Sequence, residues 1–239
     1  MKDAAYTIYS LGNSALTIDF GNIIDLKINE QVIALFNQLM QHPLHAVKEV
    51  VPAYSTLTVY YNFFEAHKKK NSELTVFEWM KEQVKTVLNN DFETAKKEEK
   101  LIRIPVCYAD KFATDINTIA DGNKISAEEI INVHSSGSYK VFMLGFLPGF
   151  AYMGQVDERI SYTRKQQPVN VAAGSVGIAG RQTGIYPFDS PGGWQIIGRT
   201  PFQLFDKQNS NPTLFEAGDI VQFYSITKDE FEDIKARNT

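Results

Sequence analysis

The sequence predicts an α+β protein, with a small two-layer α/β unit at residues 1–95 followed by a β-rich unit at residues 96–239. Strand pairs alternate with amphipathic helices in the first part, and a charged segment then interrupts the apolar pattern. Short β-branched runs separated by glycine and proline fill the remainder. With 44% hydrophobic and 22% charged residues, the composition is that of a folded globular chain.

Two strand pairs and a helix open the first unit. The strands are predicted at residues 6–10 and 15–20, joined by a Gly-Asn-Ser turn typical of a hairpin, and at residues 47–51 and 57–62. A helix is predicted between the pairs, because apolar residues recur with the spacing of one buried helical face at Ile28, Val32, Leu35, Phe36, Leu39 and Met40.

A second helix follows the second strand pair. It is predicted to begin at Thr75, whose hydroxyl caps the helix while Glu78 completes a capping box. The preceding Lys68–Lys70 run is interpreted as a solvated turn, with a phosphate or membrane patch as the alternative. Residues 89–100 lack the periodic apolar residues of the helix and are rich in charged residues. This pattern indicates either a linker or a solvated extension of this helix.

The second unit has a different pattern of residues. A strand is predicted at residues 101–108, a short helix after a capping box at Ser126 and Glu129, and another strand at residues 139–146. From Pro148 to the end, glycine and proline alternate with short β-branched runs. This pattern is typical of an all-β sandwich or barrel.

Charge and cysteine content exclude several classes of protein. A net charge of −4 offers no electrostatic footprint for nucleic acid. The chain has no apolar run near the roughly 20 residues of a membrane span and no signal-peptide core, so a cytoplasmic location is expected. The only cysteine, Cys107, has no base nearby in sequence and is interpreted as a strand residue rather than a nucleophile.

The stretch from Gly174 to Pro201, GSVGIAGRQTGIYPFDSPGGWQIIGRTP, is dense in glycine. It is not a Walker loop, because the lysine and the spacing are missing, and no long helix follows to complete a Rossmann fingerprint. The glycines indicate either barrel turns and bulges or a ligand surface built from backbone. Polar side chains between them favour the ligand surface, and we expect one face to carry Arg181, Gln182, Thr183, Tyr186 and Gln195.

A second dense stretch, Met143–Gly154, places aromatic residues around a Leu-Pro-Gly turn. Its residues alone favour a core strand with a turn, and a pocket wall is the alternative. His134, at the end of the short helix, is a candidate base or a partly buried polar residue. His42 and His45 lack a third ligand for zinc. Carboxylates available for acid–base chemistry, although turn and rim roles fit them better, are Asp157, Glu158 and Asp189.

The segments GFLPGFAYMG, GSVGIAGRQTGIYP and SPGGWQIIGRTP, together with IPVCY and VPAYSTLTVYY, resemble the allophanate hydrolase subunit 1 family. That family includes the B subunit of 5-oxoprolinase and the sporulation-kinase inhibitor of bacilli, and the resemblance covers nearly the whole chain. It implies an N-terminal α/β domain followed by a cyclophilin-like β-barrel. It also implies a homologous-fold partner, of the type of allophanate hydrolase subunit 2 or the C subunit of 5-oxoprolinase, and a third 5-oxoprolinase subunit.

The resemblance implies ATP-dependent opening of 5-oxoproline to L-glutamate, with ATP bound together with partner subunits because this chain has no nucleotide motif. The first alternative is a binding module that inhibits the autophosphorylation of a histidine kinase. The second is a subunit that acts in allophanate or urea-related amidolysis. A urea-linked carboxyl-transfer role needs a biotin carrier nearby, and this chain shows no biotinylation segment of its own.

The lactam of 5-oxoproline offers a carboxylate, an amide N–H and a carbonyl, which arginine, amide and hydroxyl groups complement. We predict that the catalytic residues are His134, Gln182 and Thr183. Substrate-binding residues are predicted at Phe146, Pro148, Gly149, Arg164, Gly174, Arg181, Tyr186, Ser190, Gly192, Gly193 and Gln195. No metal site is expected. Thr163 and Ala172 replace prolines common in the family, which we expect to loosen local turns.

Overall fold

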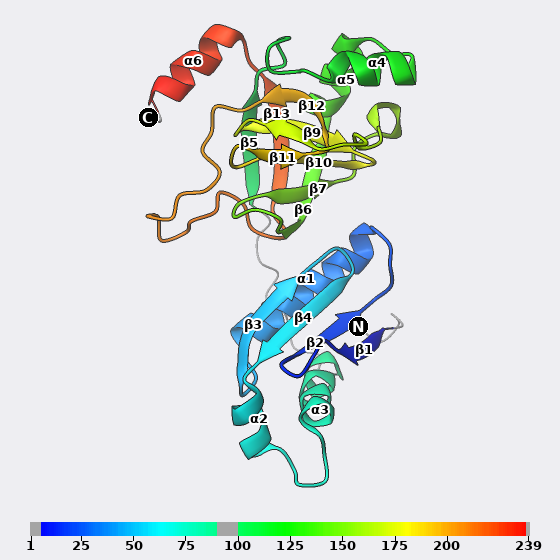
Figure 1. Ribbon diagram of the computed structural model, residues 1–239, viewed down its shortest axis with the longest axis vertical. Coiled ribbons are helices and arrows are strands. Elements are labelled where there is room, and N and C mark those ends of the chain that lie inside the picture. The colour runs from blue at the N-terminus through cyan, green and yellow to red at the C-terminus, as the bar shows by residue number, and fades with distance from the viewer. Residues whose placement is uncertain (1–5, 90–99, 238–239) are drawn as a thin grey trace. The chain divides into compact units, whose positions relative to one another are not determined.

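The computed structural model describes residues 6–89 and 100–237 (Figure 1). The chain divides into two compact units, Met1–Glu98 and Glu99–Thr239, and each is described by itself. The predicted boundary after residue 95 lies outside the described residues, as does nearly all of the charged segment predicted as a linker or helix extension.

The first unit contains a four-stranded antiparallel sheet in the order β1-β2-β4-β3. Its strands are β1 (Thr7–Ser10), β2 (Ala15–Asp19), β3 (Val47–Pro52) and β4 (Thr56–Tyr61). Both predicted strand pairs are therefore confirmed. The register places Leu16 opposite Val59 and Ile18 opposite Leu57, so that alternating apolar residues share one buried face.

The described part of this unit also contains the helices α1 (Leu26–Gln41), α2 (Phe63–Lys69) and α3 (Val76–Asn89). The capping box predicted for α3 is confirmed, because the Glu78 N–H donates to Thr75 Oγ1 and the Thr75 N–H donates to Glu78 Oε2. Helix α2 was not predicted, and the basic run that was interpreted as a turn lies at its end. Met40 of α1 is 59% exposed, so the predicted apolar face ends one residue earlier.

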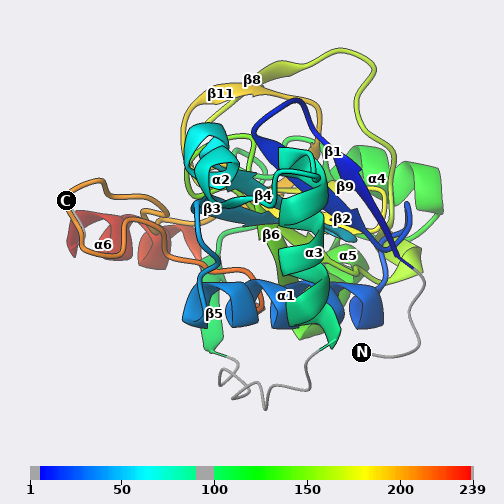
Figure 2. The ribbon, with the colours of Figure 1, turned by 90° about the horizontal axis from the view of Figure 1, so that it is seen from below.

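One hydrophobic core joins α1 and α3 to the sheet. It includes Leu35 and Leu39 of α1, Met80 and Val84 of α3, and alternating residues of β4. Figure 2 shows the two helices crossing, and they contact each other directly. The first unit is thus a two-layer α/β structure, as the sequence predicted.

The second unit is built on a nearly closed sheet of seven strands in the order β12-β9-β10-β7-β6-β13-β5 (Figure 1). The strands are β5 (Leu101–Val106), β6 (Ser138–Leu144), β7 (Ala151–Gly154), β9 (Ser175–Ala179), β10 (Gln182–Ile185), β12 (Gln195–Arg199) and β13 (Ile220–Ser225). The two edges meet where Cys107, just after β5, exchanges backbone hydrogen bonds of 2.9 and 3.0 Å with Arg199 of β12. The predicted barrel is confirmed, and Cys107 is one of the residues that close it.

Helices and a small ribbon decorate the barrel. The elements are α4 (Ile116–Asn123), α5 (Ala127–Ser136), the 3-10 turn η1 (Glu158–Ile160), α6 (Lys228–Arg237), and β8 (Val169–Val171) paired with β11 (Ser190–Gly192). The expectation of strands alone from Pro148 to the end is wrong at α6. This helix has its own capping box, in which the Glu230 N–H donates to Thr227 Oγ1 and the Thr227 N–H to Glu230 Oε2.

The barrel interior is filled by one hydrophobic cluster. Inward-facing residues such as Ile104, Val141 and Ile178 are fully buried, and Ile119 of α4 and Ile130 of α5 belong to the same cluster. Because α4 and α5 contribute to this core, their positions are fixed relative to the strands.

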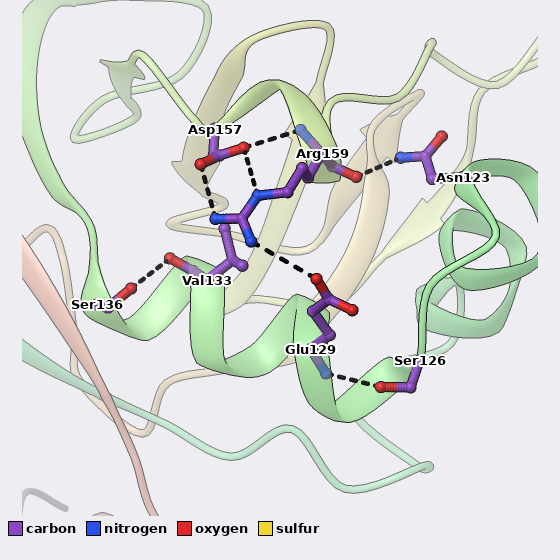
Figure 3. A network of polar contacts seen from close by, with 7 residues as sticks. All are labelled: Asn123, Ser126, Glu129, Val133, Ser136, Asp157 and Arg159. Atoms are coloured by element: carbon purple, nitrogen blue, oxygen red, sulfur yellow. Dashed lines mark hydrogen bonds and ion pairs between the residues drawn. The ribbon is translucent and has the colours of Figure 1, made fainter.

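A polar network at the surface ties α5 to the turn that contains η1 (Figure 3). Arg159 donates from Nε and from a terminal nitrogen to Asp157, at 3.0 and 2.9 Å, and lies 3.5 Å from Glu129 of α5. Asn123 of α4 donates to the carbonyl oxygen of Arg159 at 2.9 Å, and Ser126 Oγ accepts from the Glu129 N–H at the start of α5. The network joins three elements around the helix that carries His134.

Candidate functional site

The glycine-rich stretch surrounds two adjoining features of the barrel unit, an aromatic cluster and a cationic pocket. Val171 and Ile196 contribute to both. The predicted site residues are distributed between the aromatic cluster, the barrel interior and exposed turns.

The aromatic cluster is centred on Phe150. Its ring lies 5.4 Å from Trp194, 5.2 Å from Tyr186 and 4.8 Å from Tyr152, in edge or tilted geometries. The guanidinium of Arg164 lies 5.8 Å from the Trp194 ring. Arg164 and Tyr186, both predicted to bind substrate, are thus brought to one cluster, where Tyr186 is only 1% exposed and acts in packing.

The glycines of this stretch serve close packing around the aromatic rings. A Cβ on Gly192 would lie 2.5 Å from the Tyr186 hydroxyl oxygen, and one on Gly184 would lie 2.9 Å from the Ala151 carbonyl oxygen. Gly193 is less constrained, since its Cβ would meet no atom nearer than 3.7 Å, while its carbonyl accepts a hydrogen bond from the Lys165 N–H. The interpretation of the glycines as barrel turns and close contacts therefore explains Gly184 and Gly192.

The Phe146–Gly149 turn lies at the edge of the aromatic cluster. Phe146 is 61% exposed with φ +70°, and its ring meets Phe150 edge-on at 5.7 Å. Pro148 is exposed, and Gly149 has φ +82°, a conformation that favours glycine. The turn therefore presents the Phe146 ring to solvent, and the pocket-wall alternative for this stretch stays a prediction.

His134 is fully buried and held by side chains on both ring nitrogens. Nδ1 lies 2.8 Å from the Tyr108 hydroxyl, and Nε2 lies 3.0 Å from Thr183 Oγ1. Thr183 donates its own hydroxyl proton to the Gly177 carbonyl at 3.1 Å, so Nε2 carries the imidazole proton and Nδ1 accepts from Tyr108. His134 is therefore placed as a neutral imidazole with one fixed tautomer.

Burial lowers the pKa of His134 to about 3, because no compensating charge accompanies the desolvated ring. A general base functions best with a pKa near the working pH. The geometry gives His134 and Thr183 a structural role inside the barrel, and their catalytic assignment stays a prediction.

The five polar residues expected on one face do not share it. Thr183 points into the barrel toward His134, whereas Arg181 is exposed in the β9–β10 turn and Gln182 is half-buried at the start of β10. Gln195 is buried and donates to the Thr163 carbonyl at 3.0 Å. Strand alternation separates Gln182 from Thr183, because neighbouring residues of β10 point to opposite sides of the sheet.

Ser190 and Gly174, also predicted to bind substrate, lie at the base of the β8–β11 ribbon. The Ser190 hydroxyl is buried and has no hydrogen-bond partner among the described residues. Gly174 has φ +81°, and its N–H donates to the Tyr186 carbonyl at 2.7 Å. These contacts give Gly174 a conformational role in the chain leading to β9.

The cationic pocket has a volume of about 160 Å³ and lies between β12, the β8 ribbon and the loop before α4. Its lining includes three cations and no carboxylate, and it consists of Lys111, Phe112, Thr114, Lys165, Val169, Asn170, Val171, Ala172, Ser175, Ile196 and Arg199. An excess of positive charge in a small recess favours an anion.

Two of the three cations have carboxylate partners outside the lining. Lys165 Nζ lies 2.6 Å from Asp115 Oδ2, and Lys111 Nζ lies 3.2 Å from Glu232 Oε1. Arg199 donates from Nε to the Ala173 carbonyl at 2.7 Å, and within the described ranges this is its only side-chain hydrogen bond. The terminal nitrogens of Arg199 therefore remain available for a bidentate contact.

Arg199, Lys165 and Lys111 were not among the predicted site residues. Arg199 stands in the quoted motif SPGGWQIIGRTP, and Lys165 follows the predicted Arg164, so a signal was present. Lys111 joins them only through the fold, because the barrel closes at Cys107 and Arg199. Sequence spacing alone does not reveal that Lys111 lies near Arg199 and Lys165.

Two of the three carboxylates considered for acid–base chemistry, Asp157 and Asp189, have turn roles. Asp157 accepts from the Arg159 N–H and side chain, and these hydrogen bonds lower its pKa to about 2. Asp189 accepts from the Ala173 N–H at 2.7 Å. Across residues 6–89 and 100–237, no group of three His, Cys, Asp or Glu is placed to hold a metal, and no helix has the length and apolar character of a membrane span.

This architecture, an α/β unit with a nearly closed barrel, recurs in solved structures. The structure of TTHA0988 matches with a TM-score of 0.74 and 28% identity, covering 89% of this chain and 40% of that chain. The present chain thus spans less than half of that longer protein.

The family model for the carboxyltransferase domain, subdomain C and D, matches residues 6–215, and the chain belongs to this family. The B subunit of 5-oxoprolinase from Bacillus subtilis (strain 168) is 41% identical over 232 residues, covering 96% of this chain and 97% of the relative. The corresponding B subunit from Haemophilus influenzae is 37% identical over 217 residues, covering 90% and 96%. The resemblance inferred from the sequence motifs is confirmed.

Proposed function

We propose that this chain is a subunit of an ATP-dependent 5-oxoprolinase, which opens the lactam of 5-oxoproline to give L-glutamate. The observation that carries the proposal is the near full-length similarity to two relatives that are named as the B subunit of 5-oxoprolinase. The word subunit in those names supports an assembly with further chains. We assign to it a homologous-fold partner of the C type and a third 5-oxoprolinase subunit.

The nucleotide is assigned to the partner subunits or to a surface shared with them. The cationic pocket, at about 160 Å³, is smaller than the roughly 300–1,000 Å³ of a site for a drug-sized ligand. The glycine-rich stretch also lacks the lysine and the following helix of a phosphate loop. We therefore assign a small organic acid, rather than ATP, to the cationic pocket, whose size and charge favour such a ligand.

A reconstituted assembly tests the proposal. The chain is purified with a C-type partner and the third subunit, and glutamate release from 5-oxoproline is measured with and without ATP. We expect ATP-dependent turnover that is lost when this chain is omitted. Equal turnover without this chain, or no turnover with 5-oxoproline, contradicts the proposal.

The same preparation addresses the alternatives raised by the sequence, which stay predictions. Allophanate and urea replace 5-oxoproline in parallel reactions, and a histidine-kinase autophosphorylation assay is run with excess chain. Turnover with allophanate or urea alone would assign the chain to urea-related amidolysis. Kinase inhibition without any turnover would assign it to a binding module.

A further inference from the structure

We propose that the cationic pocket of the barrel unit binds the carboxylate of a small acid, with Arg199 as the anchoring residue and Lys165 and Lys111 in support. The identity of that acid, 5-oxoproline, rests on the proposed function. None of these three residues was predicted to bind substrate from the sequence.

The first argument is charge. Of the three cations, Arg199 is half-buried and has no carboxylate partner among the described residues, whereas Lys165 is paired with Asp115 and Lys111 with Glu232. The Arg199 guanidinium is hydrogen-bonded to the Ala173 carbonyl and lies 6.0 Å from the centre of the Phe112 ring, and neither contact neutralises its charge. A bound anion would supply an opposite charge at Arg199.

The second argument is the rigidity of the anchor. The Arg199 backbone is hydrogen-bonded to Cys107 through both its N–H and its carbonyl, and it pairs with Ser175 across β12 and β9. The Nε–H bond to the Ala173 carbonyl then fixes the guanidinium plane. A guanidinium held in this way can donate hydrogen bonds to both oxygens of a carboxylate without losing further conformational freedom.

The third argument is the arrangement around the anchor. Lys165 has a side chain only 19% exposed, and it is oriented by Asp115, which also accepts a hydrogen bond from the Ile196 N–H at 2.7 Å. Phe112, Val171 and Ile196 supply apolar walls. A ligand with one carboxylate on a small ring therefore meets both cations and hydrocarbon in this pocket.

The size of the pocket selects a small ligand. Its volume of about 160 Å³ lies below the roughly 300–1,000 Å³ of a site for a drug-sized ligand. The lining also offers the Ser175 and Thr114 hydroxyls and the Asn170 amide as neutral hydrogen-bonding groups for the lactam. The pocket therefore favours a five-membered ring acid over a nucleotide.

Binding to the full-length chain tests the proposal directly. Isothermal titration calorimetry is performed with 5-oxoproline, with 2-pyrrolidinone, which is the same lactam without its carboxylate, and with inorganic phosphate. We expect 5-oxoproline to bind and 2-pyrrolidinone to bind at least about tenfold more weakly, since hydrogen bonds to charged groups are among the strongest. Arg199→Gln should raise the dissociation constant for 5-oxoproline about tenfold or more.

Further variants distinguish the specific contact made by Arg199 from the effect of its charge alone and from an effect on folding. Arg199→Lys keeps the charge without the fork and should recover only part of the affinity. Lys111→Gln, at a half-exposed side chain, should weaken binding a few-fold without affecting the fold. Arg103→Gln, on the exposed face of β5 over Tyr224, removes the same charge away from the pocket and should leave affinity unchanged.

The outcomes separate this proposal from the proposed function. Turnover of 5-oxoproline by the assembly with an unchanged KM for Arg199→Gln overturns the pocket assignment and leaves the enzyme assignment intact. Arg199-dependent binding in the absence of turnover supports the pocket and removes the enzyme assignment. Binding of phosphate alone, or no binding of 5-oxoproline at millimolar concentration, overturns the pocket assignment.

Discussion

At the scale of single residues, His134 shows how the fold determines the chemistry of a titratable group. The ring is fully buried, stacks on Phe223 with a centroid separation of 4.5 Å, and is hydrogen-bonded to Tyr108 and Thr183. Desolvation disfavours the charged form and lowers the pKa to about 3. The residue that resembles a general base in the sequence is therefore a buried neutral imidazole, and its catalytic role stays a prediction.

The first prediction concerns the protonation of His134. In the unfolded chain its pKa returns to about 6.5, so the unfolded state binds more protons between about pH 6.5 and pH 3. The stability contributed by the neutral ring is complete above about pH 6.5 and is lost as the pH falls toward 3. NMR spectra of the ring protons should show His134 neutral from about pH 8 down to about pH 5.

The signals of His134 are assigned by their absence in a His134→Gln variant. The expected tautomer has its proton on Nε2, which nitrogen chemical shifts distinguish from the Nδ1 form. A titration midpoint near neutral pH would contradict the buried neutral state and favour the catalytic prediction.

At the scale of elements, the turn before β9 depends on one glycine. Gly174 has φ +81°, and a Cβ at this position would collide with the Thr200 carbonyl oxygen. Its own carbonyl accepts from the Thr200 N–H at 2.9 Å, which ties the chain ahead of β9 to the residue after Arg199. The predicted substrate-binding role of Gly174 is better explained by this support of the pocket wall.

The second prediction compares Gly174→Ala with Gly180→Ala. Gly180 also has positive φ, at +59°, but no atom lies within 4 Å of an added Cβ. Gly180→Ala should lower the free energy of unfolding by about 1–2 kcal/mol, which is the cost of the left-handed conformation. Gly174→Ala adds overpacking and should cost roughly a further 1–3 kcal/mol.

Urea denaturation of both variants measures the difference, and calorimetry with 5-oxoproline adds a functional readout. Gly174→Ala should also weaken binding of the acid, because it displaces the segment next to Arg199, whereas Gly180→Ala should not. Equal stability of the two variants would contradict the steric argument.

Elements with a strong local signal were predictable, and those with a weak one were not. Helices α3 and α5 were predicted from capping boxes, and the paired strands from alternation and turn residues. Helix α4 was missed because it is short and includes Gly122, a poor helix former. The capping-box signal for α6, Thr227 with Glu230, was present in the sequence. It was not used, because the strand-like pattern of the preceding residues favoured strands to the end of the chain.

The candidate site was less predictable for a physical reason. Aromatic and glycine residues are close together in the sequence around Phe150. Their packing role could therefore be inferred from the sequence, where it was the simpler of two interpretations. The pocket, in contrast, joins Lys111, Lys165 and Arg199 from three separate segments. Their proximity depends on where the barrel closes, and no local pattern records that position.

At the scale of the whole molecule, each unit has a large hydrophobic core of its own. The first core contains residues between Leu16 and Leu88, and the barrel core contains residues between Ile102 and Phe223. All residues that line the cationic pocket belong to the second unit. We therefore propose that the division predicted from the sequence, with a second domain at residues 96–239, is also a division in folding.

The last prediction is that a fragment of residues 96–239 folds alone and binds 5-oxoproline with the affinity of the full chain. The matched control is a fragment of residues 108–239, which lacks β5 and Cys107. Its β13 loses a six-residue parallel neighbour, and the barrel core loses Ile102, Ile104 and Val106. Loss of several buried aliphatic side chains, at about 2–5 kcal/mol each when truncated to alanine, approaches or exceeds the usual stability of a domain, about 5–15 kcal/mol.

NMR spectra and calorimetric unfolding of the two fragments decide this point. The longer fragment should give dispersed amide signals and a cooperative transition, and the shorter one should give neither. The control also removes Cys107, whose backbone holds Arg199 at the closure of the barrel, so any residual structure should not bind the acid. A longer fragment that fails to fold would show that the barrel requires the first unit, and would contradict the division into independent domains.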